Sequence, residues 1–497
     1  MSQEEGGRNM AMEAVQSDSQ LWVRLLAYLY GWRRSRWMCE LDFARSSEIE
    51  RAQSARLGRL LTHAAETVPH YADVFARLHT QPHGGEPLDV LEQMPPLTKA
   101  DIEANFPDRM LSGGRRSATS RHVATSGTTS DRIEVVLSVM AQHRRHAQQL
   151  WCDEVGGGCA PGLRRVEIPP DSCSRVCGQA VDRPEGLVAE MRWAAGRSSK
   201  PARAAADSLA RRLRGAVRKC ILNDTTLPPL LGPGGTTAAA EAIAHHVELI
   251  RHERPYLLSG LPTYLQEIAR HLERTDRRLQ VPVVRPIGSL STTSMKRLIG
   301  ERLGGAVFET YGSNELGSVA SECEAHDGLH VAAGCFVVEV LRDGRPAGAG
   351  KLGRIAVTSL DNYAMPLLRY DIGDVGRMRP AGCECGRNTP LIECHGRLQS
   401  LIVTSAGRTV TEEEVMELAY SELEVEHFQL VERKPGRFDL LVVAPPDRSV
   451  DLSAVGTAFA RLLDEPEQLE VFEVETIYPE ATGKFRFVKS ASYDQFR

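Results

Sequence analysis

The sequence lacks a hydrophobic run long enough to cross a membrane. The one segment that resembles an anchor, Leu21–Tyr30, contains Arg24 and is shorter than the ~20 apolar residues of a spanning helix. We expect a helix docked on the protein there, with a peripheral membrane contact as the alternative. The sequence also shows no secretory leader, and we therefore expect a cytoplasmic protein without a transmembrane segment.

The chain also lacks a surplus of positive charge. Its 60 Lys and Arg against 65 Asp and Glu give a net charge of -5, whereas a surface that coats nucleic acid needs the opposite balance. No nucleic-acid partner is expected.

The 11 cysteines, in a chain of 497 residues without a leader, favour reduced thiols or metal ligands over a disulfide framework. Single cores stop growing near about 250–300 residues, so this length predicts more than one domain.

A polar turn near the middle of the chain is the strongest candidate for a ligand site. The β-prone run Ala306–Phe308 leads into Tyr311-Gly-Ser-Asn-Glu315, and open α/β sheets place ligand sites where a strand ends in such a turn. The tyrosine offers a flat face for a base, and the glycine permits close approach of the backbone. Ser313 and Asn314 can bond phosphate, and Glu315 offers Mg²⁺ a hard oxygen. A solvated turn without a ligand is the alternative.

A second candidate is a turn rich in hydroxyl groups, Thr125–Ser130, which two strand-like runs flank within His122–Leu137. The GxxxxGK[ST] spacing of a Walker loop is absent from it. Hydroxyls and amide hydrogens concentrated on a tight turn still suit a polyphosphate, because each donor meets a charged acceptor. The alternative is a hairpin without a ligand.

Strands alternate with helices through the body of the chain. Residues 20–78 have a helical pattern that breaks at Pro69, and Thr98 is a plausible N-cap for the next helix. Pro255–Tyr264 and Val281–Leu290 each begin as a strand and lead into a helix. This alternation predicts a doubly wound α/β body. The stretch from 155 to 235, which includes a candidate amphipathic helix over 201–217, is the least readable.

Two pairs of soft ligands suggest a metal site. Cys323-x2-His326 and Cys383-x-Cys385 are separated by a long segment, a pattern typical of tetrahedral Zn²⁺ sites. Unrelated buried thiols are the alternative. Cys173-x3-Cys177 has no second pair nearby and is read as coincidence. Between the two pairs, Met365–Asp374 reads as a strand that ends on two carboxylates.

The last hundred residues have a compact pattern of their own. From Leu401, short strands and helices predict a small α+β domain, with a hairpin turning at Pro435-Gly436. The domain ends in the loop Pro479–Arg486, which carries Lys484 in a chain that otherwise prefers arginine. A compact ammonium group on a loop with a glycine hinge can be moved onto a carboxylate or phosphate. A solvated tail is the alternative.

Taken in order from about Leu57 to the C-terminus, these motifs resemble the adenylate-forming superfamily, and most closely the phenylacetate-CoA ligase and CapK-like branch. The most specific marks are Tyr311-Gly-Ser-Asn-Glu-Leu-Gly317, Glu322-Cys-x2-His-x-Gly-Leu-His330, Met365-Pro-Leu-Leu-Arg-Tyr-Asp-Ile-Gly-Asp374, Cys383-x-Cys-Gly-Arg387, Gly396-Arg397 and Gly483-Lys484.

The resemblance implies an α/β fold with a large multi-sheet N-terminal domain and a small mobile C-terminal α+β domain. The expected divisions are an N-terminal extension over 1–50, partly disordered and then helical, a large domain over 51–397 and a small domain over 398–497. The implied reaction is ATP-dependent activation of a carboxylic acid as an acyl-adenylate, followed by acyl transfer. CoA is the usual acceptor in this branch, and a carrier-protein thiol or an amine is the alternative. A homodimer is an open expectation.

The resemblance also assigns roles to single residues. Lys484 would bridge the attacking carboxylate and the α-phosphate, Glu315 would hold Mg²⁺, and Asp374 with Arg397 would bind the ribose. Tyr311 would stack on the adenine beside Gly288 and Ser289, with Gly312 and Ser313 in the same turn. The zinc would be structural. The residues expected to hold the ATP phosphates are Thr125, Ser126, Gly127, Thr128, Thr129 and Ser130.

Five positions depart from the pattern of the superfamily. Ser130 replaces a glycine and Arg132 a proline in the hydroxyl-rich turn, and Asn314 replaces a threonine but can still donate a hydrogen bond. More importantly, Gln399-Ser400 replaces the acidic pair usual at the hinge of the small domain. The sequence therefore supports adenylation better than thioester formation.

The acyl substrate is expected to be an aryl or heteroaryl acid. Trp151, Ser259–Tyr264 and Ile287–Leu290 are the candidate pocket walls, and no acidic residue among them would pair with an amino group. Two other functions remain open. One is a nucleotidyltransferase resembling coenzyme F390 synthetases, which keeps AMP on its product. The other is a non-catalytic ATP- or acyl-binding relic, which would have no need of Lys484.

Overall fold

The computed structural model describes residues 31–114, 121–124, 133–158, 162–169, 224–228, 230, 240–380, 382–423, 425–478 and 485–496. The hydroxyl-rich turn over 125–130, Arg132, Cys173, Cys177, the candidate helix over 201–217 and Lys484 lie outside these residues.

Helices make up the first described part of the chain. Pro69 occupies the first turn of α3, where a missing N–H costs nothing, and the helical pattern therefore breaks at Val68. Thr98 caps α5 as predicted, because its side chain accepts from the backbone N–H of Asp101 at 3.1 Å. The elements are a helix over 31–42, α2 (Ser46–Thr67), α3 (Pro69–Leu78), α4 (Pro87–Gln93) and α5 (Lys99–Asn105).

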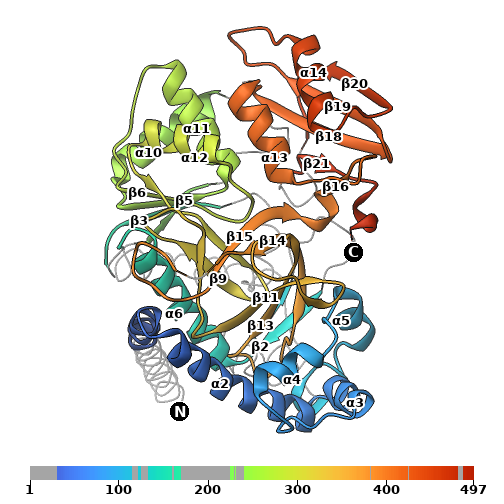
Figure 1. Cartoon of the computed structure of the whole chain (residues 1–497). Helices are drawn as coiled ribbons and strands as arrows, with labels where there is room; N and C mark the ends of the chain where they lie inside the picture. The colour runs from blue at the N-terminus through green and yellow to red at the C-terminus, as the bar shows by residue number, and fades with distance from the viewer. Residues whose placement is uncertain are drawn as a thin grey trace, which may run out of the picture.

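A parallel sheet of five strands follows, and its order is β4-β3-β5-β6-β7. Helices follow or precede these strands along the chain, which confirms the predicted alternation (Figure 1). The hairpin β1–β2 and helix α6 come before the sheet. The bounds are β1 (Arg121–Ala124), β2 (Glu134–Leu137), α6 (Val139–Val155), β3 (Arg165–Ile168), β4 (Asp224–Thr226), α10 (Ala240–Glu253), β5 (Leu257–Gly260), α11 (Pro262–Arg274), β6 (Val283–Pro286), α12 (Thr293–Leu303) and β7 (Ala306–Val307).

An antiparallel sheet of eight strands, in the order β12-β11-β13-β14-β15-β10-β9-β8, forms the second layer. The alternation of strands and helices in the sequence did not indicate this sheet. Its strands are β8 (Thr310–Ser313), β9 (Gly317–Glu322), β10 (Leu329–Val331), β11 (Phe336–Arg342), β12 (Arg345–Pro346), β13 (Gly353–Ser359), β14 (Tyr370–Met378) and β15 (Leu391–Arg397).

The two sheets meet at the motif Tyr311–Glu315. It was predicted as a turn throughout, but Tyr311–Ser313 lie in strand β8 and the turn begins at Asn314. The backbone N–H of Phe308 donates to Val284 at 3.0 Å and so extends the pairing of β6 with β7. Two residues later, Thr310 pairs with Ser321 in the antiparallel sheet. Gly312 must be glycine in this hairpin, because a Cβ there would lie 2.1 Å from the carbonyl oxygen of Gly317. The motif therefore lies at the carboxyl edge of one sheet and at the border of the other.

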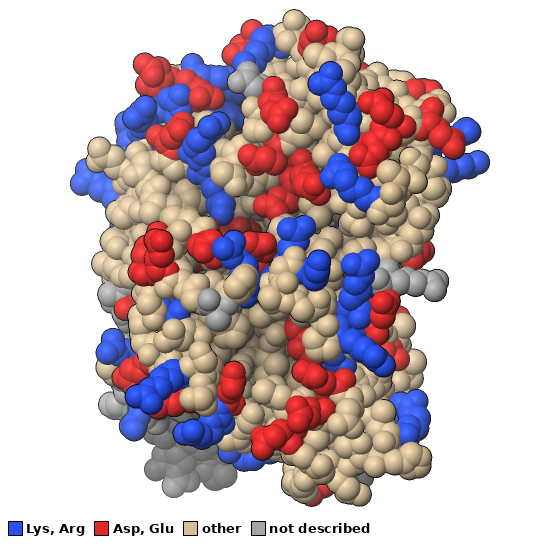
Figure 2. Space-filling model, viewed as in Figure 1, with Lys and Arg blue, Asp and Glu red and all other residues tan. Residues whose placement is uncertain are grey.

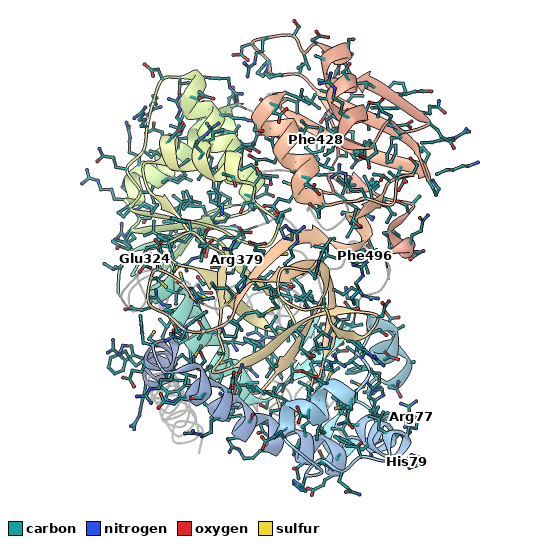
Figure 3. The ribbon with its side chains drawn as sticks, in the orientation of Figure 1. Arg77, His79, Glu324, Arg379, Phe428 and Phe496 are labelled. Atoms are coloured by element: carbon teal, nitrogen blue, oxygen red, sulfur yellow. The ribbon has the colours of Figure 1, made fainter. Side chains whose placement is uncertain are left out.

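The described residues from 398 onward, here called the small domain, form a separate sheet in the order β20-β19-β18-β21 (Figure 1). Phe428 lies in the core of this domain (Figure 3), where it is fully buried. The predicted domain boundaries stay predictions. The elements are β16 (Ile402–Val403), β17 (Thr409–Val410), α13 (Glu412–Glu417), β18 (His427–Lys434), β19 (Arg437–Val443), α14 (Leu452–Leu462), β20 (Gln468–Glu473) and β21 (Val488–Lys489).

The surface carries both signs of charge. On the face shown in Figure 2, Lys and Arg side chains are interspersed with Asp and Glu side chains. Among the described helices, none is both long and apolar enough to cross a membrane.

One arginine of the predicted strand motif is structural. Arg369 is 1% exposed, and its guanidinium donates to both oxygens of Glu339, at 3.0 and 3.1 Å. It also donates to the carbonyls of Glu92 at 3.0 Å and Gly344 at 3.1 Å. Arg369 thus joins the N-terminal helices to the antiparallel sheet.

Arg369→Met should lower the free energy of unfolding by about 3–5 kcal/mol, because it leaves the Glu339 carboxylate buried without its partner. Urea denaturation followed by tryptophan fluorescence would measure this. The matched control is Arg433→Met, which removes the exposed pair of Arg433 with Asp439 and should cost about 1 kcal/mol or less. Equal effects of the two substitutions would contradict the structural role of Arg369.

Candidate functional site

A buried carboxylate connects three of the sequence motifs. The hydroxyl of Tyr311 on β8 donates to Oδ2 of Asp374 on β14 at 2.9 Å. Arg397 stands opposite Asp374 in the β14–β15 register, and its Nε lies 3.1 Å from Oδ1. The structure thus brings together Tyr311, Asp374 and Arg397, which sequence analysis had assigned to one nucleotide site.

The protonation of this network follows from its burial. Burial raises the pKa of the Tyr311 hydroxyl well above its ordinary value, and the charge of Asp374 raises it further. Tyr311 therefore keeps its proton and acts as a donor. The carboxylate of Asp374 also raises the pKa of the Arg397 guanidinium, so that Arg397 stays charged.

The predicted magnesium ligand lies close to this network. Glu315 is 6% exposed, and its Oε1 accepts a hydrogen bond from the hydroxyl of Tyr370 at 3.0 Å. Burial and the Glu315 charge raise the pKa of the Tyr370 hydroxyl, so Tyr370 is a donor as well. Sequence analysis did not assign Tyr370 a role. A strand's period of two places positions 370 and 374 on one face, and that signal could have found it.

An arginine from α6 holds the turn from the other side. Arg145 donates through one nitrogen to the carbonyl of Asn314 at 2.7 Å and through another to the carbonyl of Glu315. Burial lowers the pKa of Arg145 to about 10, which still leaves it charged at neutral pH. No sequence pattern linked Arg145 to a turn 170 residues away. Its effect is to fix the backbone that carries Glu315.

Gly288 and Ser289 follow β6, the neighbour of β7 in the parallel sheet. Carboxyl ends of adjacent parallel strands meet at one edge, so these residues share an edge with the turn after β7. Gly288 has φ +83°, a left-handed conformation that glycine adopts without strain. The structure therefore places the predicted adenine border on the same edge as the Tyr311 turn.

The hinge segment has an acid nearby although its own sequence lacks one. Gln399 and Ser400 belong to a short 3-10 turn, Leu398–Ser400. Glu412 of α13 is 8% exposed, and its carboxylate accepts from the backbone N–H of Arg397 at 3.4 Å. Burial raises the pKa of this carboxyl. An acidic group from the small domain thus lies against the hinge in this arrangement.

Three of the four predicted metal ligands lie together, and a different histidine is the fourth member of the cluster. The ligand atoms of Cys323, His330, Cys383 and Cys385 all lie within 4.8 Å of one another. His326 was predicted as the fourth ligand, and that assignment was wrong. Its Nδ1 lies 3.2 Å from Oε1 of Glu322, and its ring stacks on Phe308 at 5.1 Å.

Strand pairing explains the exchange of histidines. β10 runs antiparallel to β9, which brings His330 opposite Ser321 and close to the turn that carries Cys323. Nδ1 of His330 lies 3.0 Å from the Thr389 hydroxyl, and its Nε2 lies 3.3 Å from Sγ of Cys385. Spacing along the sequence favoured His326, whereas spacing across the two strands selects His330.

The candidate acyl walls do not form one cluster. Trp151 is fully buried in the core of the antiparallel sheet, and its indole donates to Asp42 at 2.8 Å. Burial raises the pKa of that Asp42 carboxyl to about 7. Tyr264 lies in the separate core of the parallel sheet. Trp151 is therefore a core residue, because its large apolar surface is covered by the antiparallel sheet.

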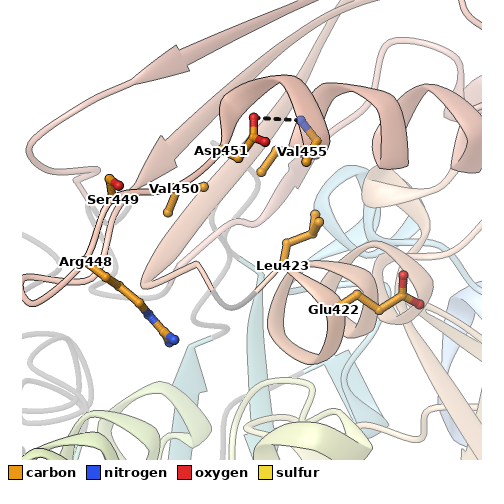
Figure 4. Close-up of a pocket in the computed structure, with 8 residues that line it drawn as sticks. Glu422, Leu423, Arg448, Ser449, Val450, Asp451 and Val455 are labelled. Atoms are coloured by element: carbon orange, nitrogen blue, oxygen red, sulfur yellow. Dashed lines mark hydrogen bonds between the residues drawn. The ribbon is translucent and has the colours of Figure 1, made fainter.

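A shallow hollow of about 190 Å³ lies on the small domain, away from these residues (Figure 4). Asp451 caps α14 at its rim, accepting from the backbone N–H of Ala454 at 3.1 Å. The predicted site contributes none of its lining, which consists of Glu422, Leu423, Arg448, Ser449, Val450, Asp451, Ala454 and Val455.

Sequence comparison identifies related enzymes. No family model matches the chain. Two proteins named phenylacetate-coenzyme A ligase are similar along most of their length. The one from Thermus thermophilus is 26% identical over 413 residues, which cover 80% of this chain and 82% of the relative. The one from Escherichia coli is 25% identical over 417 residues, covering 81% and 83%.

Solved structures share the fold. A 2-hydroxyisobutyryl-CoA ligase in its postadenylation state matches with a TM-score of 0.65 and 16% identity, covering 91% of this chain and 92% of that chain. The same ligase in its thioesterification state gives 0.53, at 17% identity and 90% coverage of both chains. The resemblance that the motifs predicted is thereby confirmed: the chain is similar in sequence to proteins named phenylacetate-coenzyme A ligase and shares its fold with a solved CoA ligase.

Proposed function

We propose that this protein activates a carboxylic acid with ATP as an acyl-adenylate and then transfers the acyl group to a thiol, with CoA as the acceptor. The observation that carries the proposal is the Asp374 carboxylate between Tyr311 and Arg397, next to Glu315. This arrangement offers a nucleoside a carboxylate for its ribose hydroxyls and a metal-binding carboxylate for its phosphates.

The first half-reaction is a displacement at phosphorus. A carboxylate oxygen of the acid attacks the α-phosphorus of ATP, and the bond from phosphorus to pyrophosphate breaks. Catalysis of such a step depends on positioning and on neutralisation of charge. Lys484 supplies a positive charge between the carboxylate and the α-phosphate, and the hydroxyl-rich turn over 125–130 binds the departing phosphates.

A magnesium ion fits the chemistry of Glu315. Tyr370 donates to Oε1 of this buried carboxylate, and the carboxylate would provide the hard oxygen ligand that Mg²⁺ prefers. The ion would neutralise charge on the phosphate oxygens. Tyr370 and Arg145 fix the side chain and the backbone of Glu315, so that the carboxylate is in place before the nucleotide arrives.

In the second half-reaction the sulfur of CoA attacks the acyl carbon, AMP departs, and the thiol proton is released to solvent. The names of the relatives favour an arylacetic acid and CoA over a carrier protein or an amine. The candidate acyl walls other than Trp151, Ser259–Tyr264 and Ile287–Leu290, contain no acid. This supports an aryl acid over a free amino acid.

Lys484→Ala should reduce acyl-adenylate formation from ATP and an aryl acid by at least about 100-fold, because a charge contact made in the transition state is lost. ATP binding, measured by calorimetry, should change little. Lys489→Ala, five residues along the same chain segment, is the matched control and should leave the rate unchanged. Adenylate formation by Lys484→Ala within tenfold of the control would remove Lys484 from the mechanism.

We also propose that Cys323, His330, Cys383 and Cys385 bind one structural Zn²⁺. Three thiols and one imidazole nitrogen are the donor set of closed zinc sites. The Thr389 hydroxyl lies 3.0 Å from Nδ1 of His330 and orients the ring so that Nε2 faces the thiol of Cys385. Four protein ligands leave no open position, so the ion would stabilise the fold and take no part in the reaction.

Elemental analysis of the purified protein should find about one zinc per chain. His330→Ala should lower both the zinc content and the melting temperature. His326→Ala is the control, since its ring lies outside the cluster, and it should keep full zinc. Loss of zinc from His326→Ala but not from His330→Ala would show that the cluster binds metal differently from the proposal.

A further inference from the structure

A buried contact joins the small domain to helix α11 of the parallel sheet. Nε2 of His427, at the start of β18, lies 3.0 Å from Oε1 of Glu267, and each side chain is about 2% exposed. Arg270 and Arg274 of the same helix approach Glu426 at 3.4 and 3.2 Å. Figure 1 shows α11 beside the small domain.

The charges at this contact are matched. Burial alone would raise the pKa of the Glu267 carboxyl, but His427, Arg270 and Arg274 lower it below its ordinary value. Arg270 also donates to the carbonyl of Val425 at 2.9 Å and to that of Glu426. Each acid therefore faces its partner across the boundary between the two cores. Glu267 of α11 faces His427, and Glu426 of the small domain faces Arg270 and Arg274.

The contact leads to the loop that carries Lys484. The ring of Phe485, the next residue, stacks on His427 with ring centres 5.7 Å apart and planes at 20°. The carbonyl of Arg486 accepts from Gln429 at 2.8 Å, and the Arg486 guanidinium donates to the carbonyl of Gln399 at 3.1 Å. The segment that follows Lys484 is therefore fixed at its beginning by a side chain that α11 holds.

This contact belongs to one arrangement of the chain. Glu267 is on a helix packed in the core of the parallel sheet, and His427 begins a strand of the small domain. A rotation of the small domain about the hinge would separate them. The higher match to the postadenylation state than to the thioesterification state of one and the same ligase, 0.65 against 0.53, indicates an arrangement nearer the former.

We propose that Glu267 and His427 are positioning residues for the adenylation half-reaction. Through Phe485 they hold the segment that directly follows Lys484, and they release it when the small domain turns for thioester formation. The pair does not touch the substrate. This inference rests on the proposed function, because it assumes that Lys484 serves adenylation. It assigns a positioning role to the buried contact of Glu267 with His427, which lies outside the segment of Gln399 and Ser400.

The test separates the two half-reactions in Glu267→Gln and His427→Gln. Acid-dependent exchange of pyrophosphate into ATP should fall at least about tenfold in kcat, with KM for ATP little changed, because fewer molecules adopt the competent arrangement. Thioester formation from supplied acyl-adenylate and CoA should stay within about twofold of wild type. The double variant should lose no more than either single variant, since both break one contact.

Two further variants distinguish a selective effect on adenylation from a general loss of folding. Phe485→Leu keeps an apolar side chain in a half-buried position and should reproduce the selective loss of exchange. Arg277→Gln removes an exposed pair with Glu248 just beyond α11 and should change neither half-reaction. Equal loss of both half-reactions in the Glu267 and His427 variants would mean that the pair only stabilises the fold, and would overturn the proposal.

Hydrogen exchange gives a readout that does not depend on activity. In Glu267→Gln, amide exchange should rise in 262–274 and in 425–430 but not in the core strands β5 and β6. If wild-type protein activates no acid, the proposed function fails, and these two segments still decide whether the contact exists. Unchanged exchange in both segments would show that the pair does not hold the small domain.

Discussion

The buried carboxylate of Asp374 is the constraint on which the site depends. Its two oxygens are held by Tyr311 and Arg397, which come from different strands of the antiparallel sheet. A buried carboxylate is stable only when paired and hydrogen-bonded, so these partners must stay in place for the fold to persist. The same requirement keeps three sequence motifs at fixed distances. A nucleotide that enters the site would meet groups already oriented by the fold.

The position of the Glu315 carboxylate follows from the way the two sheets are joined. The chain passes from β7 into β8 without an intervening helix, so the turn carrying Glu315 lies at the edge of both sheets. Arg145 from α6 then fixes the backbone of that turn, and Tyr370 from β14 fixes the carboxylate of Glu315. Both contacts join elements that lie far apart in the sequence. The site therefore depends on the packing of α6 and of both sheets.

The contacts of the small domain with the rest of the chain determine how firmly it is held in one arrangement. Its contacts with the rest of the chain are partly apolar, since Met295 of α12 packs into its core and Val375 clusters with Leu401 and Phe496. Others are polar: Glu412 lies beside Arg397, and Glu426 and His427 lie at α11. Polar contacts can be exchanged for water when a domain moves, as the proposed change between two half-reactions would require.

Features that depend on neighbouring residues could be predicted from the sequence, whereas features that depend on long-range contacts could not. The strand before Tyr311, the cap at Thr98 and the hairpin at Pro435-Gly436 were predicted correctly because a few neighbouring residues determine each of them. His326 was placed wrongly because strand register, not sequence spacing, brings His330 to the three cysteines.

Sequence analysis also missed groups that act across the fold. Trp151 was placed in the acyl pocket because an aromatic side chain suits a pocket wall, although the antiparallel sheet covers it. Arg145 and Glu267 had no signal in single motifs, since their partners lie far away in the sequence, whereas Tyr370 lies within the Met365–Asp374 motif but was given no role.

In the proposed reaction the acid's own oxygen attacks the α-phosphorus of ATP. An aryl acid labelled with ¹⁸O in its carboxylate, incubated with ATP, CoA and the wild-type protein, tests it directly. Mass spectrometry of the released AMP should find one ¹⁸O atom on its phosphate, because the bond between the acyl carbon and that oxygen breaks in the second step. Unlabelled AMP, label in inorganic phosphate, or AMP retained on the final product would contradict the account.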